Sequence, residues 1–255
     1  PFYPSPYFFN AKVWQMMPIV SIELRKVYRQ TDDSFIAILD RIRNNTATQA
    51  DLSALNSRVA GPSGSAKATD TESQDALTIT LAARRDTVDF INEQQLAALD
   101  GDPITFVGKI QGDFPESSLP TPMELQLKAG AQIIFIKNDK EKRWVNGTLG
   151  TIEYIDEEEG IIGIITESGL EFDVERDIWE NMKYTFNEKE QKIDETLLGT
   201  YTQFPIRLAW AITVHKSQGL TFKQVSIDFG GGGAFAGGQT YVALSRCTSL
   251  EGISL

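Results

Sequence analysis

The stretch that decides the fold is Thr213-Val-His-Lys-Ser-Gln-Gly-Leu-Thr221, in the last quarter of a chain of 255 residues. It places the sole histidine, His215, beside a lysine, a serine and a glutamine, and then Gly219, where backbone can approach a ligand closely. Small hydrogen-bond donors beside a cation suit contacts with a phosphate backbone. The same residue types also suit the solvated polar end of a helix.

A second segment, Gly238-Gln-Thr-Tyr-Val-Ala-Leu-Ser-Arg246, ends on an isolated arginine. Tyr241, Val242 and Leu244 have the spacing of a buried helix face, which would hold Arg246 rigidly at the end of the helix. A guanidinium held in this way can be aimed at a phosphoryl group, as an arginine finger is. The alternative for an isolated arginine is a surface salt bridge.

A third segment, Leu24-Arg-Lys-Val-Tyr-Arg-Gln30, lies just before a predicted helix. We expect Ile22–Tyr28 to form a strand, which would place Arg29 and Gln30 between the end of a strand and the start of a helix. α/β proteins bind ligands at that edge of their sheets. Each of the three segments is a weak signal when taken alone.

The hydrophobic pattern outside these segments predicts an α/β body, because helical and strand periods alternate along the chain. Residues 61–74 are polar and of low complexity, which predicts a loop. The other predicted elements are helices beginning near Asp32 and Thr48, a strand Leu77–Leu81, a helix Thr87–Leu99, a strand Ile104–Val107, and helix and strand alternating again through Leu208–Ser217, Val225–Phe229 and Gln239–Cys247.

Between Leu125 and Val174 the period changes to strands alone, which predicts a small SH3-like β-barrel inserted into the α/β body. Trp144 is expected to cover the start of the barrel, and Asn146-Gly147 to make one of its turns. The predicted strands are Ile133–Lys137, Thr148–Ile155, Ile161–Thr166 and Leu170–Val174.

The negative charge of the sequence is confined to one segment. The formal net charge is −11, and residues 151–200 hold 15 acidic and 4 basic side chains, so the rest of the chain is neutral. An acidic average therefore does not exclude a nucleic-acid partner, because local potential decides such binding. Two interpretations stay open for the acidic segment: it faces away from a bound strand, or it repels a duplex.

Cysteine and hydropathy set further limits. One cysteine, Cys247, excludes an internal disulfide framework, and a single histidine leaves no His/Cys metal site to predict. The apolar runs are much shorter than the roughly 20 residues of a membrane helix, and no signal segment opens the chain. We expect no membrane partner and a reducing, cytoplasmic location.

Taken in order, the motifs resemble superfamily 1 DNA helicases of the PIF/RecD-like branch, superfamily 1B, which move 5′ to 3′. The resemblance covers the chain from about Phe8 to Leu255 and is carried most strongly by HKSQG followed by YVALSR. It implies a RecA-like domain with an inserted SH3-like barrel. The motifs that carry it are VYRQTDDSF, LAARRDTVDFIN, GAQIIFIKND…WVNGTLG, FPIRLAWAITVHKSQGLTF and YVALSRCTSLEGI.

The resemblance also implies a role for individual residues. Arg246 would be the arginine finger, and Arg29 would contact the γ-phosphate of ATP. The residues implied to face the nucleotide are Arg29, Gln30, Gln218, Gly219 and Arg246, and those implied to face single-stranded DNA are Arg84, Thr213, His215, Lys216 and Ser217.

The P-loop string Gly-x-x-x-x-Gly-Lys-Ser/Thr of such motors does not occur in the sequence, and Gly230–Gly233 has no lysine after it. We therefore expect the C-terminal half of a helicase, inactive alone, whose ATP and Mg²⁺ are bound mainly by an N-terminal RecA-like domain. The expected divisions are 1–124 and 201–255 for the RecA-like domain and 125–200 for the barrel. The alternative is a non-catalytic single-stranded nucleic-acid-binding or adaptor module.

Overall fold

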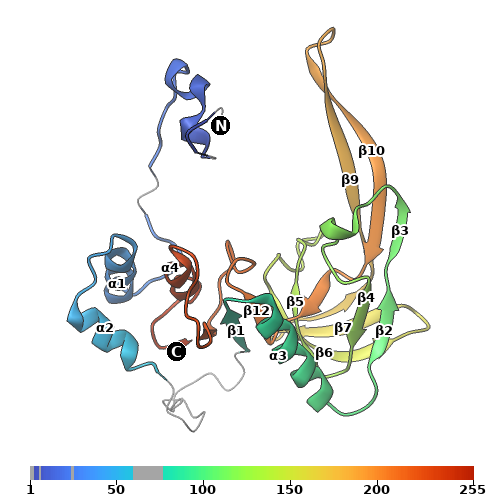
Figure 1. Ribbon diagram of the computed structural model, residues 1–255. Helices are drawn as coiled ribbons and strands as arrows, with labels where there is room; N and C mark the ends of the chain where they lie inside the picture. The colour runs from blue at the N-terminus through green and yellow to red at the C-terminus, as the bar shows by residue number, and fades with distance from the viewer. Residues whose placement is uncertain (1–2, 6, 24–25, 60–76) are drawn as a thin grey trace.

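A parallel sheet forms the centre of the α/β body (Figure 1). The computed structural model describes residues 3–5, 7–23, 26–59 and 77–255, so the loop predicted over 61–74 lies outside the described residues. The sheet has the strand order β12-β1-β13-β14, and all of its pairings are parallel. Its strands are β1 (Thr78–Ala82), β12 (Ala211–Thr213), β13 (Gln224–Asp228) and β14 (Ile253–Ser254).

Helices cover both faces of this sheet. Ile79 and Leu81 of β1 are fully buried in one core with α1 (Asp33–Arg43) and α4 (Gln239–Leu244). Ala82, whose side chain points to the other face because successive strand residues alternate, packs with α3 (Arg85–Ala98). This arrangement confirms the predicted α/β class.

The predicted strand Ile22–Tyr28 is wrong for the residues described there. Residues 26–28 are extended but belong to no ladder among the described residues, and Tyr28 is 80% exposed. The alternating apolar spacing is typical of a strand, but no strand among the described residues lies beside this segment to pair with it. Residues 3–5 and 7–23, with the short turns η1 (Phe8–Asn10) and η2 (Lys12–Met16), lie away from the body (Figure 1).

The segment Leu208–Ser217, where we expected helix and strand to resume, contains no α-helix. It holds the end of β11 (Ile206–Leu208), the strand β12 and the turn that follows. Its short apolar run is compatible with the period of a helix or of a strand. The segment forms a strand because it pairs with β1.

Between Ile104 and Leu208, all of it described, the chain forms strands and no α-helix. The four predicted strands are present as β5 (Gln132–Phe135), β6 (Leu149–Asp156), β7 (Ile161–Thr166) and β8 (Glu171–Val174), in one sheet of order β11-β5-β6-β7-β8. β2 (Ile104–Val107) pairs with β4 (Glu124–Leu127). The SH3-like barrel and its boundaries stay a prediction.

A long hairpin projects from this strand region (Figure 1). Its strands β9 (Asp177–Asn187) and β10 (Lys192–Gln203) form a three-stranded sheet with β3 (Lys109–Gly112). The distal part of the hairpin exposes Tyr184, Phe186 and Ile193. The sequence pattern does not predict the hairpin, because its strands are rich in charge and most of their residues face no core that would impose a clear alternation.

One buried amide joins the two regions. The Nε2 atom of Gln132 donates to the carbonyl oxygens of Thr78, at 3.0 Å, and Ala209, at 2.8 Å. Ile134 and Leu149 of the strand region also enter the core of the α/β body. The strand region is therefore packed against the sheet and not tethered to it by chain alone.

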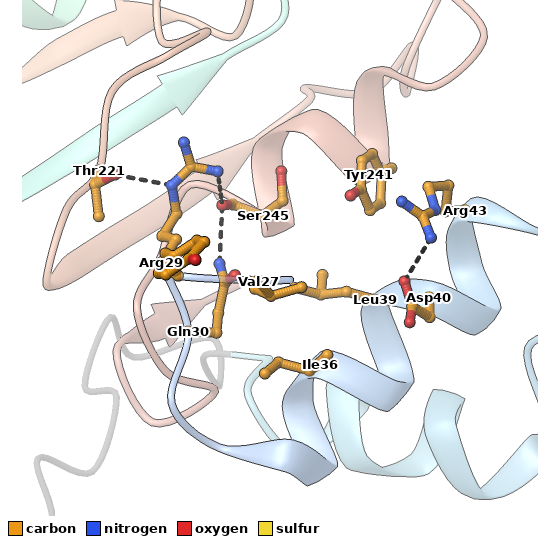
Figure 2. A pocket seen from close by; sticks show the side chains of 11 residues that line it. Val27, Arg29, Gln30, Ile36, Leu39, Asp40, Arg43, Thr221, Tyr241 and Ser245 are labelled. Carbon is orange, nitrogen blue, oxygen red and sulfur yellow. Dashed lines mark hydrogen bonds and ion pairs between the residues drawn. The ribbon is translucent and has the colours of Figure 1, made fainter. Parts of the chain in front are cut away.

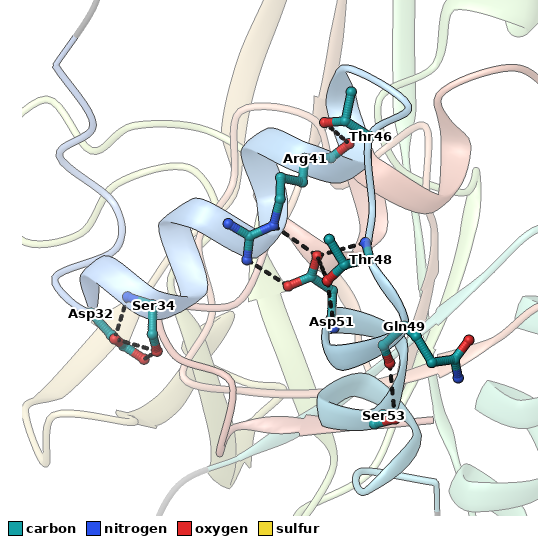
Figure 3. A network of polar contacts seen from close by, with 8 residues as sticks. All are labelled: Asp32, Ser34, Arg41, Thr46, Thr48, Gln49, Asp51 and Ser53. Atoms are coloured by element: carbon teal, nitrogen blue, oxygen red, sulfur yellow. Dashed lines mark hydrogen bonds and ion pairs between the residues drawn. The ribbon is translucent and has the colours of Figure 1, made fainter.

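An ion pair connects the first two helices (Figure 3). The Arg41 guanidinium donates to both carboxylate oxygens of Asp51, which also closes a capping box with Thr48 at the start of α2 (Gln49–Asn56). Hydrogen bonds from Arg41 and Thr48 lower the pKa of Asp51 far below its usual value. The Asp51 carboxylate thus caps α2 and also binds Arg41 of α1.

We predict that Trp144→Ala destabilises the chain by about 3–5 kcal/mol, the usual effect of removing a large buried aromatic side chain. Trp144 is 6% exposed and stacks on Phe135 with ring centroids 4.4 Å apart. The free energy of unfolding in urea measures the loss. Val145→Ala, at a neighbouring position that is 60% exposed, is the control and should change little. Equal losses for the two variants would contradict the assigned packing.

We predict that Asp51→Asn lowers the thermal midpoint at neutral pH and flattens its dependence on acid. Because folding lowers the pKa of Asp51 from 3.8, the ionised carboxylate stabilises the fold above that pH, and this stabilisation is lost as pH falls toward the lowered value. Circular dichroism melts from neutral pH to about pH 3 measure the effect. A variant that loses stability in acid as steeply as its parent would overturn this assignment.

Candidate functional site

A cavity of about 500 Å³ opens between the segment before α1 and the end of α4 (Figure 2). Arg29 lies on its wall, where Nε donates to Thr221 Oγ1 at 2.8 Å and one terminal nitrogen donates to the Ser245 carbonyl at 3.2 Å. On another wall Asp40 is already paired with Arg43 at 2.8 Å. No carboxylate among the described residues forms an ion pair with Arg29, so the cavity offers an unneutralised cation.

Gln30 fixes the neighbouring backbone. Its side chain is 5% exposed, and Nε2 donates to the carbonyl oxygens of Ser245, at 3.1 Å, and Cys247, at 2.8 Å. The amide thus ties the segment before α1 to the chain just after α4. The Gln30 side chain therefore fixes the backbone beside Arg29, and its predicted contact with a nucleotide stays a prediction.

Arg246 does not line this cavity, but its guanidinium binds the hydroxyl of Ser245, which does. Arg246 is 8% exposed, and oxygen atoms accept its hydrogen bonds: the carbonyls of Val242, Leu220 and Ser217 and the hydroxyl of Ser245. Burial, and next the charge of Arg29, lower the pKa of Arg246 to about 10, so it is still a cation at neutral pH. Neither arginine forms an ion pair with a carboxylate among the described residues, so their combined positive charge favours a nearby anion.

Arg246 also touches the turn that follows β12. One terminal nitrogen lies 3.5 Å from the carbonyl oxygen of Ser217 and 3.3 Å from that of Leu220. Gln218 and Gly219, between these two residues, are exposed, and Gly219 has φ +84°, a value that favours glycine. The structure thus brings the predicted nucleotide-facing residues to one region.

The residues expected to face a strand lie at the carboxyl ends of two adjacent parallel strands. Ala82 of β1 is in register with Thr213 of β12, so Arg84 and Lys216 follow neighbouring strand ends. Lys216 and His215 are exposed. Arg84 is exposed too and pairs with Asp86 at 3.2 Å.

Ser217 and Asn92 have structural roles. Ser217 is fully buried, and its hydroxyl donates to the Val214 carbonyl at 2.7 Å, so its side chain stabilises the turn and does not face solvent. The Asn92 amide bonds both the N–H and the carbonyl of Ala211 at 3.0 Å. Because β12 is an edge strand, Asn92 satisfies backbone groups that have no neighbouring strand.

Sequence reasoning missed two members of these sites. Thr221 binds Arg29 but was quoted only as the end of a motif. Arg207 lies in a second cavity with Lys216, and only its isolated charge in an apolar stretch could have indicated it. The described residues contain no group of three or more His, Cys, Asp or Glu side chains placed to hold a metal. No helix among them has the length and apolar character needed to cross a bilayer.

A parallel sheet that places arginines and a donor-rich turn beside its strand ends is the arrangement of a RecA-like motor domain. No family model matches the sequence. The ATP-dependent DNA helicase PIF1 of Mus musculus is 34% identical over 254 residues, which are 96% of this chain and 36% of that protein. The ATP-dependent DNA helicase Pif1 of Bdellovibrio bacteriovorus is 29% identical over 248 residues, 95% of this chain and 51% of that protein.

Solved structures agree with these relatives. The Bacteroides sp Pif1 in complex with ADP-AlF4 has a TM-score of 0.82 and 36% identity, covering 99% of this chain and 55% of that one. The Bacteroides Pif1 bound to single-stranded DNA has a TM-score of 0.65 and 35% identity, with the same coverage. The chain belongs to the Pif1 family of superfamily 1B helicases, as predicted, and matches their C-terminal part. It spans about a third to a half of the length of these relatives.

We predict that Gln30→Ala destabilises the chain by about 1–3 kcal/mol, because the Cys247 carbonyl loses the donated hydrogen bond of Gln30 and the Ser245 carbonyl keeps only that of Arg29. Gln30→Glu should destabilise it more, since a carboxylate would then face the same two oxygens. Urea denaturation measures both effects, with Gln111→Ala at an exposed position of β3 as the control. Should Gln30→Glu be as stable as the parent, Gln30 would not be the donor to those carbonyls.

Proposed function

We propose that this chain is the C-terminal motor region of an ATP-dependent 5′-to-3′ DNA helicase, with Arg246 as the arginine finger. The observation that carries the proposal is that Arg29 and Arg246 both donate to Ser245, at its carbonyl and its hydroxyl, and that neither forms an ion pair with a carboxylate among the described residues. A buried guanidinium is costly to leave without an anion, and a phosphoryl group is the anion that fits its planar fork.

The two arginines would play different parts. Arg29 lies on the cavity wall and would contact the terminal phosphate of bound ATP. Arg246 is anchored on backbone carbonyls, so it would move toward the phosphoryl group when that group develops charge during transfer. Gln218 and Gly219, beside the Arg246 contacts, would lie near the nucleotide, with Gln30 keeping the two chain segments together.

ATP and Mg²⁺ would be held mainly by a preceding RecA-like domain of the full-length protein. The cavity fits the phosphates through Arg29, whereas the P-loop string is missing from this sequence. Mg²⁺ would neutralise phosphate charge from that other domain. This chain alone would then have no DNA-stimulated ATP turnover.

Single-stranded DNA would pass over the turn after β12. His215 and Lys216 are exposed there, Thr213 precedes them, and Arg84 follows the neighbouring strand. Lysine and hydroxyl donors suit contacts with a phosphate backbone. Ser217 would contribute through the shape of the turn, since its side chain is buried. Relatives solved with ADP-AlF3 and single-stranded DNA support this partner.

Substitution of Arg246 in the full-length protein tests the proposal. Arg246→Lys keeps the charge but loses the planar fork, and Arg246→Ala removes both. We expect DNA-stimulated ATP turnover to fall by about 10³-fold or more for Arg246→Ala, as for other arginine fingers. Turnover that survives this change in a folded protein would overturn the role and favour a non-catalytic nucleic-acid-binding module.

Arg58→Ala is the matched control. Arg58 also donates to backbone carbonyls, those of Ile253 and Glu251, but it does not line the cavity. Its loss should lower the thermal midpoint without a comparable loss of turnover at a temperature where the protein stays folded. Comparing Arg58→Ala with Arg246→Ala therefore distinguishes the loss of an arginine that only stabilises backbone carbonyls from the loss of one that acts on the phosphoryl group.

A further inference from the structure

A second cavity, of about 730 Å³, lies beside the donor-rich turn. Its cations are Arg85 at the start of α3, Arg207 of β11 and Lys216 of the turn. Its apolar side is formed by Ile134, Ile136, Ile212 and Leu220, and the loop 116–122 makes another wall with the single carboxylate Glu116. The start of α3, the strand β11 and the turn after β12 thus each place a positive charge on the same cavity.

Arg207 is the unusual member of this group. Its Nε is buried and has no hydrogen-bond partner, and among the described residues no ion pair includes it. The pairing of Arg207 with Ile134 in the sheet fixes its backbone. Burial, and next the charge of Arg85, lower its pKa, yet arginine stays charged at neutral pH. A buried donor of a charged group is therefore left unused.

The surrounding charges do not neutralise Arg207. Asp89, the acid that acts on it, pairs with Arg85 at 3.4 Å. Burial, and then Arg207 and Arg85, lower the pKa of Lys216, so these cations oppose one another across the cavity. An anion bound between Arg207 and Lys216 would remove this repulsion and supply the missing acceptor.

We propose that this cavity seats a backbone phosphate of single-stranded nucleic acid, held by Arg207 and Lys216, with Arg85 at its rim. The inference rests on the proposed function and deepens it, because it adds Arg207 and Arg85 to the strand contacts of the neighbouring turn. The cavity is much larger than a phosphate, and Ile212 and Leu220 give the adjoining sugar an apolar surface. A phosphodiester within a strand therefore fits better than a free ion.

The chemistry assigns each cation a part. The planar guanidinium of Arg207 would donate through Nε and a terminal nitrogen to two phosphate oxygens, a bidentate contact. Lys216 would act as a point charge from the exposed turn. The sheet fixes Arg207 and the turn carries Lys216, so a seated phosphate would link the turn to the strand region.

Arg207→Met tests the proposal in the full chain. Fluorescence anisotropy with a labelled oligothymidylate measures binding across a salt series. We expect affinity about tenfold weaker at low salt, and a slope of log K against log salt smaller by about 0.7, the value of one phosphate contact on a single strand. Arg207→Lys should recover part of the affinity.

Lys192→Met is the matched control, because it removes one charge at the tip of the β9–β10 hairpin, where Lys192 pairs with Glu190. If Arg207→Met and Lys192→Met have the same affinity and salt slope, the proposal fails. If Arg207→Met does not fold, Arg85→Met at the exposed rim of the cavity tests the same proposal. A smaller slope of log K against log salt supports the phosphate site, and an unchanged slope overturns it.

Inorganic phosphate distinguishes a strand from a free ion. A thermal midpoint that phosphate raises in the parent but not in Arg207→Met, with unchanged oligothymidylate binding, would mean a free-ion site and would overturn the proposal. The Arg246 variants report on ATP turnover, whereas the Arg207 variants report on strand binding. Failure of the motor role and failure of the phosphate seat are therefore distinguishable.

Discussion

The hydrogen bonds of the Arg246 guanidinium are the contacts on which the two sites of the structure depend. From the end of α4 they reach the carbonyls of Ser217 and Leu220, which bracket the exposed turn between them. The same side chain shares Ser245 with Arg29, at the cavity on the opposite side. Any displacement of this guanidinium toward an anion would therefore alter the hydrogen bonds of the turn, and so would connect the proposed phosphate contact with the proposed strand contact.

Much of the fold follows from periodicity, because a core imposes a period on the residues that face it. The strand Ile161–Thr166 has the predicted bounds, and α1 begins one residue after its capping Asp32. The segment Ile22–Tyr28 and the β9–β10 hairpin lack such a core. The pattern of the first therefore predicts a strand that is absent, and the pattern of the second gives no prediction. In both segments the secondary structure depends on whether another strand is available to pair with, and a local sequence pattern does not contain that information.

The sequence indicates which residues belong to the candidate site but not which way their side chains point. Motifs predicted Arg29, Arg246 and Lys216 as site residues, and the structure places Arg29 on the wall of the first cavity and Lys216 in the turn whose carbonyls Arg246 binds, while their roles stay a prediction. No pattern indicates that Arg246 points inward or that Ser217 is buried, because both depend on carbonyls supplied by packing. The sequence does not indicate Arg207 for the same reason: only the folded structure shows that its Nε atom has no hydrogen-bond acceptor.

The Asn92 amide has a consequence for how the molecule meets copies of itself. An open edge strand is a template on which another chain can add a strand, and α/β proteins must block it. By occupying the N–H and the carbonyl of Ala211, Asn92 removes the groups of the first residue of the short β12 strand from its open edge. A strand added to that edge would have to displace this side chain of α3 before it could bond Ala211.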